Sequence, residues 1–262
     1  LRDTLGGPRQ ATDLLLPATD LGRLFPAAAQ RYLLTRGVEL RLGSRVSAIV
    51  ETPPTPTGTP SGRWQIDTVQ ESSRFDHVVL ATGPQHAAAL LPPARELAAT
   101  RAQIDQLDYE PIATAYLQYP PQVRLPQPLL ALNHGTTQWL ADRGQLGGRS
   151  GLLAHVLSAH GDWEKLDNRQ LVDALHVNTN IVLQRHAALP ALPEPQSHLV
   201  IRERRATFRC SPGLIRPSGD TGLPGFWLAG DYVAGDYPGT LEAAVRSGDA
   251  VAAGIIASVG DR

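Results

Sequence analysis

The strongest candidate for a binding site lies near the carboxyl end of the chain. A short apolar run over residues 226–229 ends in Gly230 and Asp231, and a loop leads on to a segment of small residues that begins at residue 239. This order predicts an acid at the carboxyl end of a buried strand, where open α/β sheets bind their ligands and a carboxylate can accept hydrogen bonds from ribose or ribityl hydroxyls. We therefore interpret Asp231 as a ligand residue rather than the cap of a loop, and Asp236 as a solvated loop acid.

The start of the following helix forms the second part of this candidate site. Gly239, Thr240, Leu241 and Glu242 open that helix in the sequence. Backbone N–H groups at a helix start carry partial positive charge and can hold an electron-rich ligand edge. Small residues there let a flat ring approach closely. They equally suit packing of the helix against a sheet, and the two roles are compatible.

A third element of the candidate site is Gly83, which follows an apolar run over residues 75–81. Because glycine lacks a Cβ, it lets the backbone turn sharply or approach a ligand. Taken alone, this pattern is typical of an ordinary buried strand that ends in a turn. Together with Gly230 and Asp231, it indicates two strands that end in the same way and share one crevice.

The rest of the chain predicts an α/β domain with an α+β block inserted into it. We expect a connecting helical part over residues 1–36, the C-terminal parts of a partial doubly wound dinucleotide-binding domain at residues 37–84 and 210–262, and a mixed-sheet substrate domain over residues 85–209. Hydrophobic periodicity and turn residues place helices at 26–36, 167–186 and about 240–258, and strands at 38–42, 45–51, 63–69, 75–81, 112–119, 129–133, 151–159, 199–208 and 226–231. Residues 52–62 predict a loop. The glycine-rich residues 144–151 predict a hairpin turn rather than a phosphate loop, because no G-x-G-x-x-G exists in the chain.

Composition narrows the possible functions. The net charge of −1 gives no electrostatic case for a nucleic-acid partner. The single cysteine, Cys210, excludes an internal disulfide, suits a reducing cytoplasmic compartment and is interpreted as a packing residue. The eight histidines show no metal-ligand spacing, so we expect no metal site. No apolar run approaches the roughly 20 residues that a membrane-spanning helix needs. The absence of methionine indicates a fragment or a processed product.

Several motifs together resemble a known family. Residues 37–46, 78–84, 228–231 and 241–248 resemble the FAD-dependent amine oxidase/phytoene desaturase-type flavoproteins. Within that superfamily, residues 11–17, 20–26 and 138–143 are similar to the hydroxysqualene dehydroxylases, which are squalene-associated FAD-dependent desaturases. The resemblance runs along nearly the whole chain.

The resemblance implies FAD as cofactor and assigns roles to the candidate residues. Asp231 would hydrogen-bond the FAD chain, and the amides of Thr240 to Glu242 would face the pyrimidine edge of the flavin. The family's first strand, glycine loop and ribose-binding glutamate would lie upstream of Leu1. The chain would then be a C-terminal fragment whose partner is the missing N-terminal FAD-binding segment, and alone it would be inactive and bind FAD weakly or not at all.

The resemblance also implies a lipophilic substrate, and it leaves several functions open. The first is reductive dehydroxylation of hydroxysqualene to squalene in hopanoid and squalene biosynthesis, with peripheral membrane contact because such a hydrocarbon is insoluble. A carotenoid or phytoene-type desaturase would run in the opposite redox direction. An amine oxidase is disfavoured, because the only lysine, Lys165, lies in a polar turn and Thr240 stands where an aromatic residue is usual. A non-catalytic lipid-binding or interaction module without FAD is the alternative of another class. The sequence identifies no catalytic acid.

Overall fold

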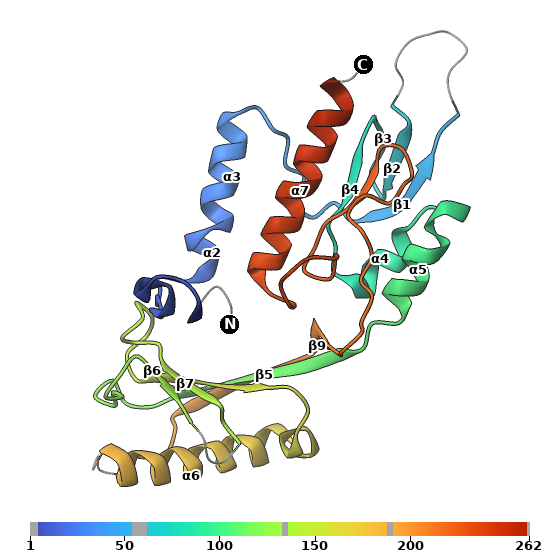
Figure 1. The fold of residues 1–262 in the computed structure, drawn as a ribbon. Coiled ribbons are helices and arrows are strands. Elements are labelled where there is room, and N and C mark those ends of the chain that lie inside the picture. The colour runs from blue at the N-terminus through green and yellow to red at the C-terminus, as the bar shows by residue number, and fades with distance from the viewer. Residues whose placement is uncertain (1–4, 54–61, 133–135, 188–190, 261–262) are drawn as a thin grey trace. The chain divides into compact units, whose positions relative to one another are not determined.

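The chain forms two compact units, and two long strands run from one unit into the other. The computed structural model describes residues 5–53, 62–132, 136–187 and 191–260 (Figure 1). Unit 1 comprises Leu1–Leu40 and Ile112–Glu203, and unit 2 comprises Arg41–Pro111 and Arg204–Arg262. The boundaries at residues 111 and 203 fall inside strands β5 and β9, so each of these strands begins in one unit and ends in the other.

Unit 2 is built around a pair of parallel strands. Strand β4 (Val78–Leu80) pairs in parallel with β10 (Phe226–Leu228), with Leu80 opposite Leu228. An antiparallel sheet of β1 (Val46–Glu51), β2 (Trp64–Thr68) and β3 (Ser72–Phe75) accompanies this pair. The helical elements of unit 2 are α4 (Pro84–Leu90), η2 (Arg95–Leu97), α5 (Ala98–Asp105) and α7 (Leu241–Gly260).

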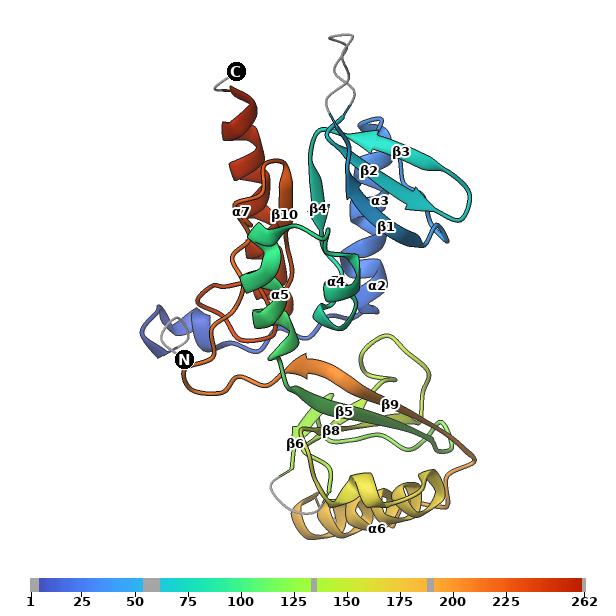
Figure 2. The same cartoon turned by 90° about the vertical axis from the view of Figure 1, so that its right-hand side faces the viewer.

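The two faces of the parallel pair are covered differently (Figure 2). Phe226 and Leu228 are fully buried in a core with Trp64 and with residues of α4 and α5. The alternate residue Trp227 lies on the other face, where it approaches Gly254 of α7. Successive side chains of a strand point to opposite faces, so α7 covers one face of the pair while α4, α5 and the antiparallel sheet cover the other.

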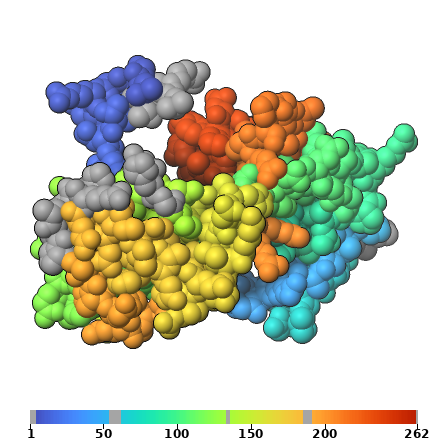
Figure 3. Space-filling model, turned by 90° about the horizontal axis from the view of Figure 1, so that it is seen from below, coloured from blue at the N-terminus to red at the C-terminus, as the bar shows by residue number. Residues whose placement is uncertain are grey.

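Unit 1 is a sheet covered by one long helix. The strand order is β6 (Leu129–Ala131), β7 (Trp139–Asp142), β8 (Leu152–Ser158), β5 (Tyr109–Gln118) and β9 (Ser197–Phe208). Helix α6 (Asn168–Ala187) packs its apolar residues against one face of this sheet, and its other side contributes to the yellow and orange surface in Figure 3. Unit 1 also holds η1 (Arg9–Thr12), α2 (Leu21–Leu24), α3 (Pro26–Thr35) and η3 (Asp162–Lys165). A reciprocal capping box starts α6, because Gln170 N–H donates to Asp167 Oδ1 (2.8 Å) and Asp167 N–H to Gln170 Oε1 (3.0 Å).

The structure confirms most of the predicted elements and corrects others. The three predicted helices are present as α3, α6 and α7, and residues 144–151 form a hairpin turn between the antiparallel strands β7 and β8. The strand predicted over residues 38–42 is wrong, because these residues join no sheet and Val38 N–H instead donates to Leu33 O (3.1 Å) at the end of α3. Most of the predicted loop 52–62, and Asn133 at the end of a predicted strand, lie outside the described residues.

Three further expectations need correction. A mixed sheet was predicted for the inserted part, but its pairings β6–β7, β7–β8 and β8–β5 are antiparallel. The predicted boundary after residue 84 differs from the structure, because α4 and α5 bury their apolar residues in the core of unit 2. Cys210 is exposed rather than packed in a core. The role of the inserted part in substrate binding stays a prediction.

Helix α7 contradicts the expectation that no apolar run reaches bilayer length. By length and composition alone its 20 residues could cross a membrane, with a mean hydropathy of 1.2 in the most apolar window, of which 11% is buried. A single such helix is weak evidence for a membrane span, because core helices of folded domains meet the same criterion. Here α7 carries Glu242 and Arg246 in its first two turns and packs against Trp227.

Candidate functional site

The parallel pairing of β4 and β10 brings two of the predicted site segments to one edge. Leu80 lies opposite Leu228, and the N–H of Ala229 donates to the carbonyl of Leu80 (3.1 Å). Gly83 and Gly230 therefore both follow the carboxyl ends of neighbouring parallel strands. This confirms the prediction that the two strands end side by side. Crevices at such ends are where open α/β sheets bind ligands.

Asp231 lies half-buried at this edge. Burial raises the pKa of its carboxyl group, while the backbone N–H groups of Asp231 and Tyr232 and the positive charge of Arg216 oppose that rise. The carboxylate is thus partly withdrawn from water but held by donors. Such a group can accept hydrogen bonds from the hydroxyls of a ligand.

Gly239 lies beside Asp231, near the end of the loop that leads from β10 to α7. A Cβ at this position would lie 3.2 Å from Asp231 Oδ2 and 2.1 Å from Thr207 Oγ1. The second distance is far shorter than any real contact, so no larger residue fits without displacing the backbone or Thr207. Glycine at position 239 therefore lets the start of α7 approach the Asp231 carboxylate.

Gly230 joins the strand end to α7. Its φ of +153° is one that residues with a Cβ rarely adopt, and a Cβ would lie 2.6 Å from the ring of Tyr232. The N–H of Gly230 donates to Ser247 Oγ (2.8 Å), which lies two turns into the helix. This contact ties the backbone before Asp231 to α7.

The first turn of α7 keeps the predicted amides as its candidate ligand groups. The Thr240 hydroxyl accepts from the N–H of Ala243 (3.2 Å), so Thr240 acts as the helix cap. Glu242 forms an ion pair with Arg246 (2.6 Å), which leaves its amide rather than its carboxylate as the candidate ligand group. The N–H groups of Leu241 and Glu242 have no intrahelical acceptor by the geometry of an α-helix. Leu241 is 77% exposed.

Two buried polar atoms without partners lie beside the strand ends. Among the described residues, Thr82 Oγ1 and Tyr232 Oη are buried and make no hydrogen bond. Thr82 directly precedes Gly83, and Tyr232 directly follows Asp231. Buried hydroxyls in folded proteins nearly always find a partner, so both mark places where a ligand or a water would be accommodated. Gly83 itself is exposed, and the atoms nearest to a Cβ there would belong to the side chain of Gln85.

A cavity of about 670 Å³ extends along α7 in the same unit. Trp227, whose Nε1 is buried without a partner in the described part of the chain, lies on its wall together with Asp236 and Arg246. Sequence reasoning missed Trp227, Ser247 and Arg216, because their roles depend on the return of α7 and of the residue 210–220 segment onto β10. No local sequence pattern indicates those contacts.

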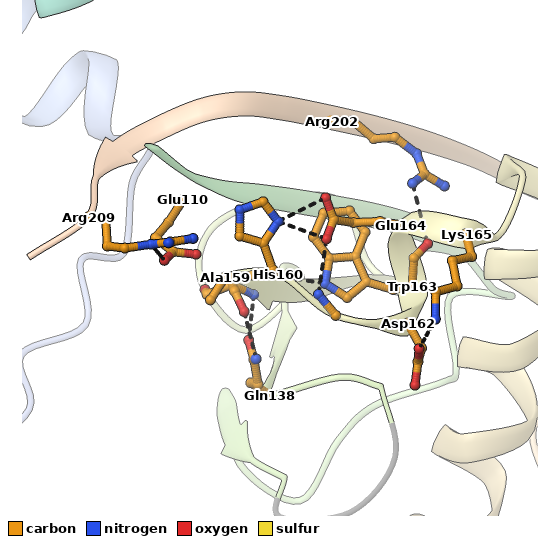
Figure 4. Close-up of polar contacts among 12 residues, drawn as sticks. Glu110, Gln138, Ala159, His160, Asp162, Trp163, Glu164, Lys165, Arg202 and Arg209 are labelled. Carbon is orange, nitrogen blue, oxygen red and sulfur yellow. Dashed lines mark hydrogen bonds and ion pairs between the residues drawn. The ribbon is translucent and has the colours of Figure 1, made fainter. Parts of the chain in front are cut away.

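The polar groups in the turn after β8 of unit 1 bond one another. After β8, the His160 ring (Nδ1) and the Gly161 N–H contact Glu164 Oε1 (3.0 and 3.1 Å), Trp163 Nε1 donates to Ala159 O (3.1 Å), and Lys165 pairs with Asp162 (Figure 4). Such mutual pairing stabilises a turn and leaves Lys165 engaged. Within the described ranges, the structure groups no three His, Cys, Asp or Glu side chains that could hold a metal ion.

Comparison with known proteins agrees with this architecture. The family described as flavin containing amine oxidoreductase matches residues 13–256 of the chain. The hydroxysqualene dehydroxylase of Sinorhizobium fredii is 27% identical over 96% of this chain, and that of Rhodopseudomonas palustris is 28% identical over 98%. The chain spans about half the length of these curated relatives, 55% and 56% respectively.

Two solved structures share the fold at low sequence identity. A protein assigned as protoporphyrinogen oxidase from Exiguobacterium sp. matches 91% of this chain and 51% of its own, with a TM-score of 0.62 and 18% identity. A redesigned putrescine oxidase matches 89% of this chain and 53% of its own, with a TM-score of 0.62 and 14% identity. The chain belongs to the family of flavin containing amine oxidoreductases.

Proposed function

We propose that this chain, as a member of the flavin containing amine oxidoreductase family, forms the carboxyl-terminal part of an FAD-dependent oxidoreductase that acts on a polyisoprenoid. The observation that carries the proposal is the shared end of β4 and β10, where Asp231 stands next to Gly239 at the start of α7. The reaction we favour is the reductive dehydroxylation of hydroxysqualene to squalene, as part of hopanoid or squalene biosynthesis. The two curated relatives bear the name of that activity.

The residues at this edge suit one end of a flavin nucleotide. Asp231 supplies a half-buried acceptor for hydroxyl groups, the unpartnered Thr82 hydroxyl supplies a further polar contact, and Gly239 leaves room for close approach. When bound, FAD supplies hydride transfer, and the protein supplies position and an apolar surrounding. The chain contains no G-x-G-x-x-G, so its described residues do not account for the diphosphate.

The direction of the reaction rests on the relatives rather than on the geometry. In the dehydroxylation, a hydride replaces the allylic hydroxyl, which leaves with a proton as water. A carotenoid or phytoene-type desaturase would instead remove a hydride from the same class of substrate. An amine oxidase fits less well, because Lys165 pairs with Asp162 in unit 1 (2.7 Å) and Thr240 is a helix cap.

Exposed apolar surface around the site supports a second protein segment as partner. On α7, Val245, Ile256 and Val259 are exposed, and on β4 so is Val79. β4 pairs only with β10 among the described residues, and a two-stranded sheet is marginally stable by itself. We propose that an N-terminal FAD-binding segment, present in the length that the relatives have beyond the matched part, covers this surface and holds the diphosphate.

The same exposed surface favours a second candidate of another class, a lipid-binding or interaction module that works without FAD. One measurement separates the two candidates. It is the visible absorption spectrum of this chain and of a version extended by about one domain length of upstream coding sequence. The enzyme hypothesis expects flavin bands in the extended protein and weak or absent bands in the chain alone. The absence of flavin bands in both proteins would contradict the enzyme hypothesis and leave the interaction module.

A lipophilic substrate also leads us to propose peripheral contact with the cytoplasmic face of a membrane. A polyisoprenoid hydrocarbon is nearly insoluble in water, so the enzyme must receive it from a lipid phase. Flotation with liposomes of mixed neutral and anionic phospholipids should carry the extended protein to the lipid fraction. Recovery of all protein at the bottom of the gradient would overturn membrane contact without affecting the assignment of FAD.

A further inference from the structure

Arg216 holds the loop that carries Asp231. Its guanidinium donates to the carbonyl oxygens of Asp231 (3.2 Å) and Tyr237 (2.9 Å), and also to that of Gly235. The guanidinium lies 5.4 Å from the centre of the Phe208 ring. One half-buried side chain thus bonds both ends and the middle of the loop between β10 and α7.

The outer stretch of the loop has few other anchors, whereas Tyr232 and Val233 before it are buried in the core of unit 2. Ala234, Gly235 and Asp236 are exposed, so apolar burial contributes little to holding this stretch. The N–H of Ala234 donates to the carbonyl of Pro217 (2.8 Å), which is the residue that follows Arg216. Residues 234–237 are therefore held mainly by the short segment 216–217, together with Arg246, whose guanidinium lies 4.7 Å from the centre of the Tyr237 ring. A planar guanidinium with five donors suits this task, because it can bind several carbonyls at once in a fixed geometry.

We propose, on the basis of the function proposed above, that Arg216 is a positioning residue that holds the 231–238 loop so that the Asp231 carboxylate and Gly239 meet the flavin nucleotide. Arg216 need not contact the cofactor. It acts on Asp231 by fixing the carbonyl of that residue and on Gly239 through the Tyr237 carbonyl, two residues upstream.

The charge of Arg216 has a second effect on the same carboxyl group. Burial raises the pKa of Asp231, and the positive charge of Arg216 opposes that rise. Burial raises the pKa of the Tyr109 and Tyr232 phenols, and the negative charge of Asp231 adds to that rise. Arg216 therefore favours the ionised acceptor form of Asp231 in a setting that otherwise favours the neutral acid.

The test compares three variants of the extended protein. Arg216→Gln removes the charge and most of the donors, and Arg216→Lys keeps the charge but loses the planar fork. Arg101→Gln is the matched control, because Arg101 is also half-buried in unit 2 and bonds the carbonyls of Ala88 and Leu91. Hydrogen exchange without added FAD should show lost protection at residues 230–239 in Arg216→Gln, and at residues 84–91 in Arg101→Gln.

Titration with FAD then tests the functional half of the proposal. We expect Arg216→Gln to lose affinity for FAD by roughly tenfold or more, and Arg101→Gln to remain within about twofold of the unmodified protein. The pH below which affinity falls should move upward in Arg216→Gln. In Arg216→Lys this pH should stay unchanged, although the affinity for FAD drops. A general loss of stability would not produce this difference in pH dependence between the two variants.

Each result decides a distinct claim. Unchanged protection of residues 230–239 in Arg216→Gln would overturn the positioning role. Unchanged FAD affinity in Arg216→Gln, or an equal loss in Arg101→Gln, would overturn its link to the cofactor. If the unmodified extended protein binds no FAD, the proposed function fails, and the exchange data alone still decide whether Arg216 holds the loop.

Discussion

Helices α6 and α7 are both 20 residues long, yet they are used in opposite ways. The residues of α6 that face the sheet of unit 1 are buried, and Leu171 and Leu175 are both fully buried there. Helix α7 is rich in apolar residues but buries only Ala243 and Val251, while Ile256 is 72% exposed. The comparison shows that α6 completes a buried core on one face of the sheet in unit 1, whereas α7 leaves much of its apolar surface exposed in unit 2.

The largest expected effect separates the two helices directly. Leu175→Ala should lower the free energy of unfolding by about 2–5 kcal/mol, because it opens a cavity between α6 and the sheet. The matched change Leu241→Ala on α7 should stay within about 0.5 kcal/mol, because that side chain is exposed. Urea unfolding followed by far-UV circular dichroism measures both. Equal losses in the two variants would show that Leu241 is covered in solution and would break the comparison.

Acid should affect unit 1 through a histidine buried in its core. His155 is fully buried, with Nδ1 3.1 Å from Thr137 Oγ1, and burial lowers its pKa to about 3. An unfolded chain protonates this imidazole near pH 6.5. Between these values the unfolded state binds more protons, so the stability of unit 1 falls as the pH drops from 6.5 towards 3.

From pH 7 to pH 5 this linkage amounts to about 2 kcal/mol. Hydrogen exchange of α6 amides at the two pH values, corrected for intrinsic rates, measures it, and His155→Gln should remove most of the difference. In unit 2, Asp231 has the opposite effect on the pH dependence of stability. A carboxyl whose pKa is raised on folding gains stability as the pH falls, because the folded state then binds more protons. If acid lowers the protection of α7 amides as much as that of α6 amides, the loss of stability does not originate in unit 1 alone.

The contrast between the units also explains what the sequence could predict. The capping box of α6 and the strand ends at Gly83 and Gly230 are local patterns, and each lies where the pattern indicates. The expectation for residues 38–42 was wrong, because alternation alone does not supply the hydrogen-bonding partner that a strand needs. Arg216 escaped notice because its three carbonyl partners are 15 to 21 residues away and become neighbours only through the loop.

The third prediction concerns the candidate site within unit 2. In the extended protein, Asp231→Ala should weaken FAD binding by roughly tenfold or more, the range expected for a lost charged hydrogen bond. Asp236→Ala is the matched control, because it removes an exposed carboxylate from the same loop. Flavin absorbance during titration with FAD measures both affinities. An unchanged affinity in Asp231→Ala, or the same loss in Asp236→Ala, would remove Asp231 from the site.

The smallest expected effect compares the two sides of α7 itself. A Cβ at Gly248 would meet open space, whereas one at Gly254 would lie 3.0 Å from the ring of Trp227. Replacing a helical glycine by alanine at an open position should raise the free energy of unfolding by about 0.5–1 kcal/mol, because alanine loses less backbone entropy on folding. Gly254→Ala should lose that gain, because the Trp227 ring must shift to admit the new methyl group.

Thermal unfolding of the two variants, made in this chain and in the version extended upstream, measures both effects. In the chain alone, Gly248→Ala should unfold at a higher temperature than Gly254→Ala. If a further segment covers α7 in the extended protein, the new methyl group at residue 248 meets that segment, and its advantage should shrink or reverse. If Gly248→Ala stabilises both proteins equally, this side of α7, which also carries Val245 and Val259, stays open, and the proposed covering of α7 by the upstream segment is wrong.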